Sequence, residues 1–522
     1  MKKNTVLLLG LSLLACVSLR AGELRNRWVY LTNSLLDENS VSTVSNVLHM
    51  ARQGGMNGAV LGCGLEFYRY WPKVRRERLA RILEICKSFK IEAIPTMWSL
   101  GYGSMQNYSV NHLEGVPIED VPYVVEGTNA VFDAASAETI EIDAKTGFQR
   151  KDGYFRLIKK VAVKPHRRYL LSFDVRTSGL TGKNPFRVVA RNANARTYYE
   201  SAKREVDLKP TQDWTSCSLE MESSESDSYY LYVGYMSGWQ TGSFELRNMK
   251  LAVIGPGNVL KRPGAPRSLR NAVTGMVYEE GRDYAVPKIQ YPVTRQGRPA
   301  VKLTLPPGSR VRSGDRLVFD CHVPAIVDGG QVSMCLSEPE LYEFLADSAR
   351  HIEEVLHPKR WYVSMDEFRN GGTCAACRAR RMTMGEIYAD AVTKVFNIIQ
   401  KVHPGAEMYI WSDMLDPGHN GVREYYNCLG SFEDAGKGIP KDIVIGCWYG
   451  AKCETSMAFF SEKGFRTFAA AYYDEKPDFP ESRRWRDAVL KTKGAGGIMY
   501  TTWRSSYADL PAFCRMINEK IP

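Results

Sequence analysis

The adjacent carboxylates Asp366 and Glu367 are the residues whose types best fit catalysis. They follow the apolar segment Trp361-Tyr362-Val363, a pattern typical of a buried strand. Cleavage of a glycosidic bond needs a proton donor for the leaving oxygen and a second group at the oxocarbenium-like centre. An apolar environment and a neighbouring carboxylate both raise a carboxyl pKa, as an acid catalyst requires. We therefore predict Glu367 and Asp366 as the catalytic residues.

Aromatic and acidic side chains recur where the other expected strands end. Aromatic rings stack on the C–H faces of sugars, and four of the ten tryptophans fall at such ends. Rings that only fill a barrel core would lie within the strands instead. The predicted substrate-binding residues are Trp98, Trp411, Asp413, His419, Trp448, Tyr473, Asp474 and Trp503.

Strands and helices must alternate to place these residues at one edge. The apolar spacing predicts strands at 28–32, 57–61, 91–98, 360–365, 407–412, 442–448, 466–473 and 497–503. It predicts helices at 41–53, 75–89, 338–356, 385–402, 456–463, 481–493 and 510–519. Eight strands separated by helices predict an α/β fold, a (β/α)8 TIM barrel, with function at the carboxyl ends of its strands.

The barrel is interrupted after its third strand. Residues 120–255 show short alternating strands between turns, which predicts an antiparallel β-sandwich. Residues 256–335 are rich in Pro, Gly and Arg and are expected to form a small β-unit or an elaborate loop. The barrel then comprises residues 23–110 and 336–522.

The segment 361–367 resembles the fourth-strand motif of family 20 glycoside hydrolases, the β-N-acetylhexosaminidases. The resemblance covers the barrel and implies that Glu367 is the general acid/base. It implies that Asp366 orients the 2-acetamido group, whose carbonyl oxygen is the nucleophile, and that Tyr473 binds that oxygen. Trp411, Trp448 and Trp503 would form the walls of the sugar site.

Two segments depart from this family pattern. The expected arginine after the first strand is absent from residues 31–37, and residues 98–102 replace the expected histidine. The sugar can therefore differ, and Asp413 or Asp474 could instead act as a protein nucleophile.

The inserted sandwich resembles carbohydrate-binding modules in its architecture. Its candidate stacking residues are Tyr198, Tyr199, Tyr229, Tyr230 and Trp239.

A Cys-x-x-Cys pair, Cys374 and Cys377, follows the catalytic strand. Such a pair is half of a zinc site and needs about two more ligands. Cys321-His322 or His419 are candidates, and a local disulfide is the alternative. We expect no metal among the site residues and no cofactor.

The N-terminus predicts export from a bacterial cell. Residues 1–22 combine Lys2 and Lys3 with a short apolar run, the pattern of a signal peptide. Residues 13–16 approximate a lipobox, which would lipidate Cys16, and cleavage near Ala21 is the alternative. The location would be the periplasm, the outer membrane as a lipoprotein, or the medium, and a lipid on Cys16 would be the only membrane contact.

The formal net charge of +11 fits a solvated basic surface or an anionic glycan. No nucleic-acid motif is present, so nucleic acid is not expected as a partner.

Three hypotheses follow. The leading one is a retaining exo-glycosidase that removes a terminal sugar, with N-acetylated and sulfated sugars as candidates. The second is a non-catalytic carbohydrate-binding lipoprotein with a degenerate barrel. The third is a metal-dependent hydrolase that uses the cysteine loop.

Overall fold

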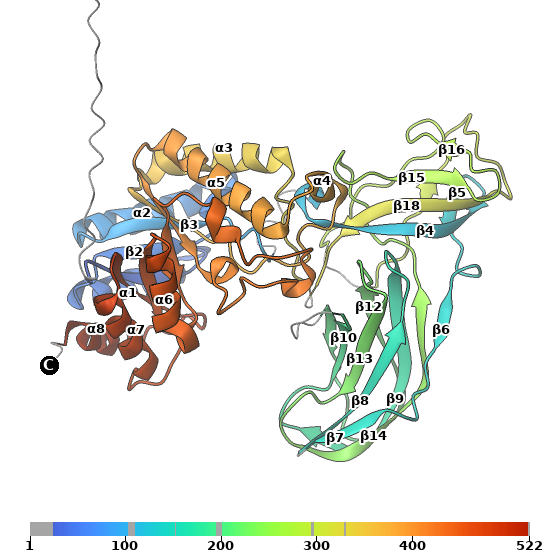
Figure 1. The fold of residues 1–522 in the computed structure, drawn as a ribbon, viewed down its shortest axis with the longest axis horizontal. Coiled ribbons are helices and arrows are strands. Elements are labelled where there is room, and N and C mark those ends of the chain that lie inside the picture. The colour runs from blue at the N-terminus through green and yellow to red at the C-terminus, as the bar shows by residue number, and fades with distance from the viewer. Residues whose placement is uncertain are drawn as a thin grey trace, which may run out of the picture.

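The computed structural model describes residues 24–102, 110–151, 153–194, 201–293, 297–327 and 330–519. The two ends of the chain form a barrel surrounded by helices, and the middle of the chain forms a β-rich insertion beside it (Figure 1). Among the described residues, no helix is both long enough and apolar enough to cross a membrane.

The barrel confirms the predicted (β/α)8 fold. Eight parallel strands close in the order β1-β2-β3-β19-β20-β21-β22-β23. Their bounds are β1 Asn26–Thr32, β2 Gly58–Gly62, β3 Glu92–Met97, β19 Arg360–Val363, β20 Glu407–Trp411, β21 Val444–Cys447, β22 Arg466–Tyr472 and β23 Ala495–Thr501.

The helices that surround the barrel follow the predicted positions within a few residues. They are α1 Glu38–Gln53, α2 Lys73–Ser88, α3 Pro339–Leu356, α5 Met384–Val402, α6 Cys453–Glu462, α7 Pro480–Lys491 and α8 Leu510–Asn518, and the short α4 spans Ala375–Ala379. The α5 helix begins with a complete capping box between Thr383 and Glu386, which satisfies backbone donors at its first turn.

Alternation along each barrel strand separates two apolar layers. In β1, Trp28 and Tyr30 belong to the cluster inside the barrel, whereas Val29 and Leu31 pack in the layer under the helices. This is the period of two that a strand imposes. Aromatic rings and smaller aliphatic side chains together fill the barrel interior, and the site must lie above them, at the carboxyl ends of the strands.

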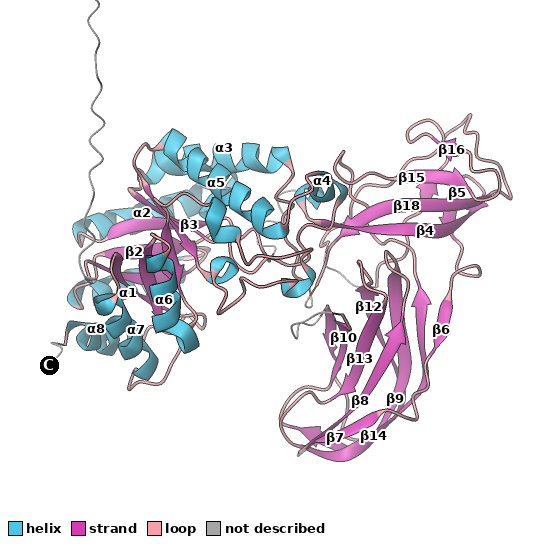
Figure 2. Ribbon diagram, viewed as in Figure 1, coloured by secondary structure: helices cyan, strands magenta, loops and turns pink. Residues whose placement is uncertain are grey.

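The insertion consists of three antiparallel sheets (Figure 2). A five-stranded sheet has the order β11-β10-β13-β8-β7, and a four-stranded sheet has the order β12-β9-β14-β6. Residues such as Leu171, Leu231 and Leu251 from both sheets share one buried core, which makes this pair a sandwich. The bounds of these strands are β6 Thr139–Glu141, β7 Phe148–Lys151, β8 Tyr154–Ala162, β9 Arg168–Gly182, β10 Arg187–Asn192, β11 Ala202–Glu205, β12 Gln212–Glu222, β13 Ser228–Gly234 and β14 Gln240–Val253.

The third sheet has six strands, in the order β16-β15-β18-β4-β5-β17. It combines strands from two parts of the chain. The strands β4 and β5 precede the sandwich in sequence, and β15 to β18 follow it. Residues 120–132, which the sequence pattern groups with the sandwich, therefore belong to this sheet. Its strands are β4 Gly115–Glu126, β5 Asn129–Phe132, β15 Ser268–Asn271, β16 Val277–Tyr278, β17 Leu303–Thr304 and β18 Arg316–Pro324.

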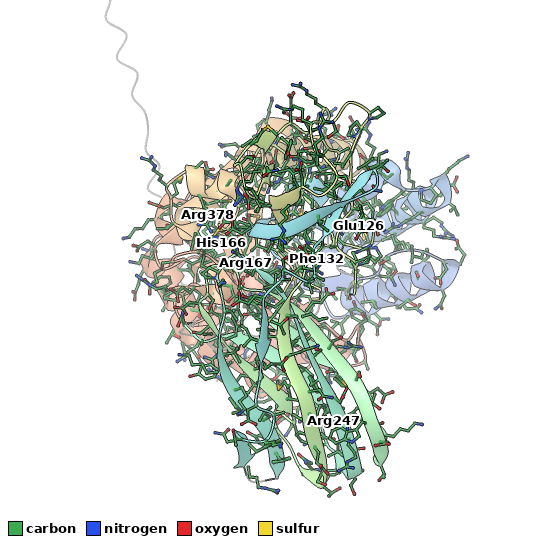
Figure 3. All side chains as sticks on the ribbon, turned by 90° about the vertical axis from the view of Figure 1, so that its right-hand side faces the viewer. Glu126, Phe132, His166, Arg167, Arg247 and Arg378 are labelled. Atoms are coloured by element: carbon green, nitrogen blue, oxygen red, sulfur yellow. The ribbon has the colours of Figure 1, made fainter. Side chains whose placement is uncertain are left out.

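Side chains of the barrel and the sandwich meet near α4. Arg378 of α4 forms an ion pair with Glu225 of the sandwich, and His166 contacts the same carboxylate at 2.9 Å. Figure 3 shows Arg378 and His166 close together at this junction, with Arg247 far away along the sandwich. The helix that carries Cys377 is thus fixed from the insertion side as well.

Candidate functional site

Asp366 and Glu367 lie just beyond the carboxyl end of β19, as predicted. The backbone turns sharply here, because Met365 and Glu367 both have φ of 51°. Such left-handed conformations are uncommon for residues other than glycine and persist only where their surroundings enforce them. The Tyr388 hydroxyl of α5 donates a hydrogen bond to the Met365 carbonyl at 2.8 Å and fixes one side of the turn.

Asp366 is the buried member of the pair. Its pKa is raised well above its ordinary value, first by burial and then by the nearby charges of Asp413 and Glu367. Within the described part of the chain, its Oδ1 atom is buried without a hydrogen-bond partner. A buried acceptor of this kind costs free energy unless a partner is supplied, so a ligand that offers an N–H or O–H group would be bound here.

Glu367 is the accessible member, with 32% of its side chain exposed. Its backbone N–H donates to Asp413 Oδ2 at 2.9 Å. Its Oε2 atom lies 3.2 Å from Nη2 of Arg369, which is itself almost fully buried. The carboxylate is therefore held at a fixed position while one side stays open to solvent.

Close backbone packing after β3 supports the turn from below. A Cβ atom at Gly101 would lie 1.8 Å from the Asp366 carbonyl oxygen, so only glycine fits. The Arg369 N–H donates to the Gly101 carbonyl at 3.2 Å and to Ser333 Oγ at 2.6 Å. The loop after β3 and the segment that precedes α3 therefore both help to position the carboxylates.

A row of aromatic rings crosses the mouth of the barrel. The Trp448 and Tyr473 rings are nearly parallel with centroids 5.8 Å apart, and Tyr473 meets Trp503 at 5.8 Å at a steep angle. Tyr473 is 41% exposed and Trp503 is 44% exposed. The pKa of Tyr473 is raised to about 12 by burial and by the charges of Glu367 and Asp366, which places its hydroxyl near the carboxylates.

Two of the predicted tryptophans are buried and do not belong to this exposed row. Trp411 is only 2% exposed and packs 4.6 Å from Tyr362 inside the barrel, so it forms the floor. Trp98 has φ of 61° and is fully buried, and its Nε1 donates to Ser348 of α3 at 3.3 Å. The left-handed backbone after β3 turns Trp98 outward under α3, away from the predicted substrate side.

The two predicted aspartates hold loops. Asp413 is fully buried, and its Oδ2 accepts from Glu367 N and from Asn420 Nδ2 at 3.1 Å. Both oxygens of Asp474 accept bonds from the loop after β23, from Thr502 Oγ1 and from Trp503 N at 2.9 Å. These residues position Glu367 and Trp503.

His419 lies at the far end of the aromatic row. Its ring stacks on Tyr449 with centroids 4.3 Å apart and meets Trp448 edge-on at 4.5 Å. Burial lowers its pKa to about 4, so the ring is neutral at neutral pH. It lies in the loop after β20, where the sequence analysis expected it, and its predicted role in substrate binding stays a prediction.

The sequence analysis missed four residues near this end of the barrel, namely Tyr30, Tyr102, Glu66 and Arg369. Tyr30 and Tyr102 both have pKa values raised by burial and by the charge of Asp366. Glu66, four residues beyond β2, is buried, and burial raises its pKa to about 7. The strand-end rule that found Asp366 could have found Glu66, whereas nothing in the spacing distinguishes Arg369.

The Cys-x-x-Cys pair has other partners than those considered from the sequence. Cys374 and Cys377 lie beside Cys335 and Glu114. By contrast, Nδ1 of His322 faces the Pro266 carbonyl at 3.0 Å, and Cys321 lies in the core of the six-stranded sheet.

Comparisons with known proteins find similar solved structures only at low identity and low TM-score. No family model matches the sequence, and no curated protein matches it. A solved family 20 β-N-acetylglucosaminidase aligns over 95% of this chain and 69% of its own, with 11% identity and a TM-score of 0.39. A chitobiase from Flavobacterium johnsoniae (8% identity, TM-score 0.40, 95% of this chain and 48% of its own) is also similar.

A β-N-acetylhexosaminidase from Bacteroides fragilis gives 8% identity and a TM-score of 0.40, over 95% of this chain and 66% of its own. The chain therefore spans about half to two thirds of the length of these structures. Such low identities and TM-scores carry no conclusion about activity, so the function rests on the side chains of this chain.

Proposed function

We propose that this chain is a glycoside hydrolase, a retaining exo-glycosidase that removes a terminal sugar from a glycan. The observation that carries the proposal is the asymmetry of the carboxyl pair. Asp366 is buried with a raised pKa, whereas Glu367 is 32% exposed beside the aromatic row. Glycoside cleavage needs two carboxyl-type groups in different environments.

Glu367 is the proposed general acid and base, because it is the member of the pair that a glycosidic oxygen can reach. It would protonate the leaving oxygen and then take a proton from the water that completes hydrolysis. Asp366 would orient the sugar through its unpartnered Oδ1. Tyr473 and Trp503, both partly exposed, would bind one face of the ring.

The nucleophile is proposed to come from the substrate, as the 2-acetamido oxygen. Asp413 is fully buried, and both oxygens of Asp474 already accept hydrogen bonds, so neither carboxylate is well placed to attack a sugar. An acetamido N–H is a suitable donor for Asp366. Tyr473 could then donate to the acetamido oxygen, as in the family that the sequence resembles.

The test is a panel of aryl glycosides: N-acetylglucosaminide, N-acetylgalactosaminide, galactoside, glucoside, fucoside and their 6-sulfated forms. We expect release from an acetamido sugar, and Glu367→Gln should lower turnover about 10²–10⁴-fold, the usual contribution of acid–base catalysis. Glu462→Gln, an exposed change on α6, is the matched control.

The other outcomes decide between the remaining hypotheses. Release only from sugars without an acetamido group would reject substrate assistance and keep the hydrolase. No release, with glycan binding retained, would reject the enzyme and favour a carbohydrate-binding protein. Preference for the sulfated sugars would support an anionic substrate, which the formal charge of +11 favours.

We also propose that the chain is exported and that the sandwich binds carbohydrate, and the two proposals are independent of each other. The leader, with Cys16, lies outside the described residues, as do Tyr198 and Tyr199. In the sandwich, Tyr229 is buried, whereas Trp239 is 52% exposed and is the proposed stacking residue. Cell fractionation tests export, and loss of polysaccharide retention in Trp239→Ala tests the sandwich.

A further inference from the structure

Four buried side chains that can bind metal meet where the barrel joins the insertion. They are Glu114, Cys335, Cys374 and Cys377, and one ligand atom from each lies within 4.8 Å of all the others. Their exposed fractions are between 0% and 2%. Exposed acidic groups often gather without an ion, but this carboxylate is shielded from water, and a buried charge is costly unless it is paired or coordinates a metal.

The distances match a tetrahedral ion site. Cys335 Sγ lies 3.4 Å from Cys374 Sγ and 3.7 Å from Cys377 Sγ, and Cys377 Sγ lies 3.5 Å from Glu114 Oε2. Zinc bonds of about 2.3 Å to sulfur and about 2.0 Å to oxygen give tetrahedral edges of about 3.8 Å and about 3.5 Å.

Neighbouring groups orient the ligands. Glu114 Oε1 accepts from Cys374 N at 2.7 Å and lies 3.2 Å from Thr373 Oγ1, which leaves Oε2 directed toward the sulfurs. Such hydrogen bonds to ligating groups are a regular feature of metal sites. Arg262, nearly fully buried, donates to Glu338 Oε2 at 2.7 Å and to the Leu113 carbonyl at 3.0 Å, and it adds a positive charge beside an anionic ligand set.

We propose that Glu114, Cys335, Cys374 and Cys377 bind one zinc-type divalent ion as a closed, structural site. The thiols bind as thiolates, so binding releases their protons. All four positions are filled by protein, which leaves no coordination position for a substrate or water and makes the ion structural. This separates the site from the metal-dependent hydrolase considered from the sequence.

A disulfide fits these atoms less well. Cys335, Cys374 and Cys377 are all free cysteines in the structure, and the Sγ atom of Cys335 lies 3.4 and 3.7 Å from the other two, beyond the bond length of about 2.05 Å. A disulfide would join only two of the three cysteines, and the third thiol and Glu114 Oε2 would take no part in it. An ion satisfies all four at once.

The site would fasten three segments that are distant in sequence. Glu114 precedes β4, and Cys335 precedes α3. Cys374 caps the short helix α4 and Cys377 lies within it, in the connection that follows β19. Thr373 Oγ1 also lies 3.0 Å from the Asn370 carbonyl, directly after Arg369. The ion would thereby stabilise the loop that holds Glu367.

The experiment measures metal in the purified full-length chain, prepared in its native state and after dialysis against Zn²⁺ or Co²⁺ under reducing conditions. We expect about one equivalent of zinc per chain, the number that four ligands to one ion require. The cobalt form should show the visible bands of a tetrahedral thiolate site. Cys335→Ser and Cys377→Ser should lose the metal, whereas Cys217→Ser, a buried cysteine of the sandwich, should retain it.

Absence of metal from the wild type under both conditions would overturn the proposal, even if the serine variants fail to fold. So would a pair of these cysteines that resists alkylation in denaturant until a reductant is added, because that result identifies a disulfide. Metal content is read independently of turnover, so this proposal can fail while the proposed function holds, and the reverse.

Discussion

The loop after β19 has two halves with opposite character. In the first half, Asp366 has a buried oxygen without a partner and Glu367 opens to solvent, so the polar groups are incomplete without a ligand from outside. In the second half, Cys374 and Cys377 are fully buried and directed at other ligating groups of the chain. A set of groups left open suits a substrate that comes and goes, whereas a closed set suits an ion that stays.

Gly101→Ala would break the first half and should have the largest effect of three changes. The new Cβ would lie 1.8 Å from the Asp366 carbonyl oxygen. This oxygen belongs to the backbone, so the clash is relieved only by a shift of the main chain. We expect the free energy of unfolding to fall by about 1–3 kcal/mol, as for overpacked sites, with glycosidase turnover reduced as well. Urea unfolding measures the first quantity. Gly436→Ala, where the added Cβ meets nothing within 4 Å, is the control, and equal stability of the two variants would contradict the packing argument.

Thr373→Val would weaken the second half of the loop. It removes the hydroxyl beside Glu114 Oε1 but keeps the side-chain volume. Loss of such a supporting group lowers metal affinity about 10-fold or more, which a competition titration against a chromophoric chelator can measure. Thr393→Val on α5 is the control. Unchanged zinc affinity would mean that the hydroxyl has no part in orienting the carboxylate.

Asp366→Asn should give the smallest effect and the most diagnostic one, a gain in stability. The folded-state pKa of Asp366 is raised, so the folded protein binds more protons than the unfolded chain between the ordinary and the raised pKa. Stability from this group is therefore lost as the pH rises through that interval. Asparagine cannot ionise, so the variant should gain of the order of 1 kcal/mol at neutral pH relative to wild type.

That gain should disappear as the pH falls below the ordinary pKa of aspartate, about 4. Unfolding curves at several pH values give the comparison, with Asp434→Asn, an exposed change, as the control. A variant that is less stable than wild type at neutral pH would show that the buried, ionised Asp366 does not destabilise the folded protein.

The order of the barrel elements was predictable because the spacing of apolar residues distinguishes each strand from each helix within its own segment. The Asp366-Glu367 pair was predictable for the same reason, since a strand end locates it. The direction of Trp98 was not, because it depends on a left-handed φ that a non-glycine residue rarely adopts. Glu114 and Cys335 were missed as partners of Cys374, because only the folding of the insertion brings residues so distant in sequence together.

The base of the insertion has a consequence for how the chain can be assembled. Its two ends run side by side, since Glu114 N donates to the Ser333 carbonyl at 2.8 Å and Cys335 N donates to the His112 carbonyl at 2.7 Å. The cost of closing a loop depends on the separation of its ends as well as its length. Because its ends are adjacent, the whole β-rich segment connects the barrel elements as a short hairpin loop would. A different module, or a short loop, could therefore replace it without changing the path of the barrel strands.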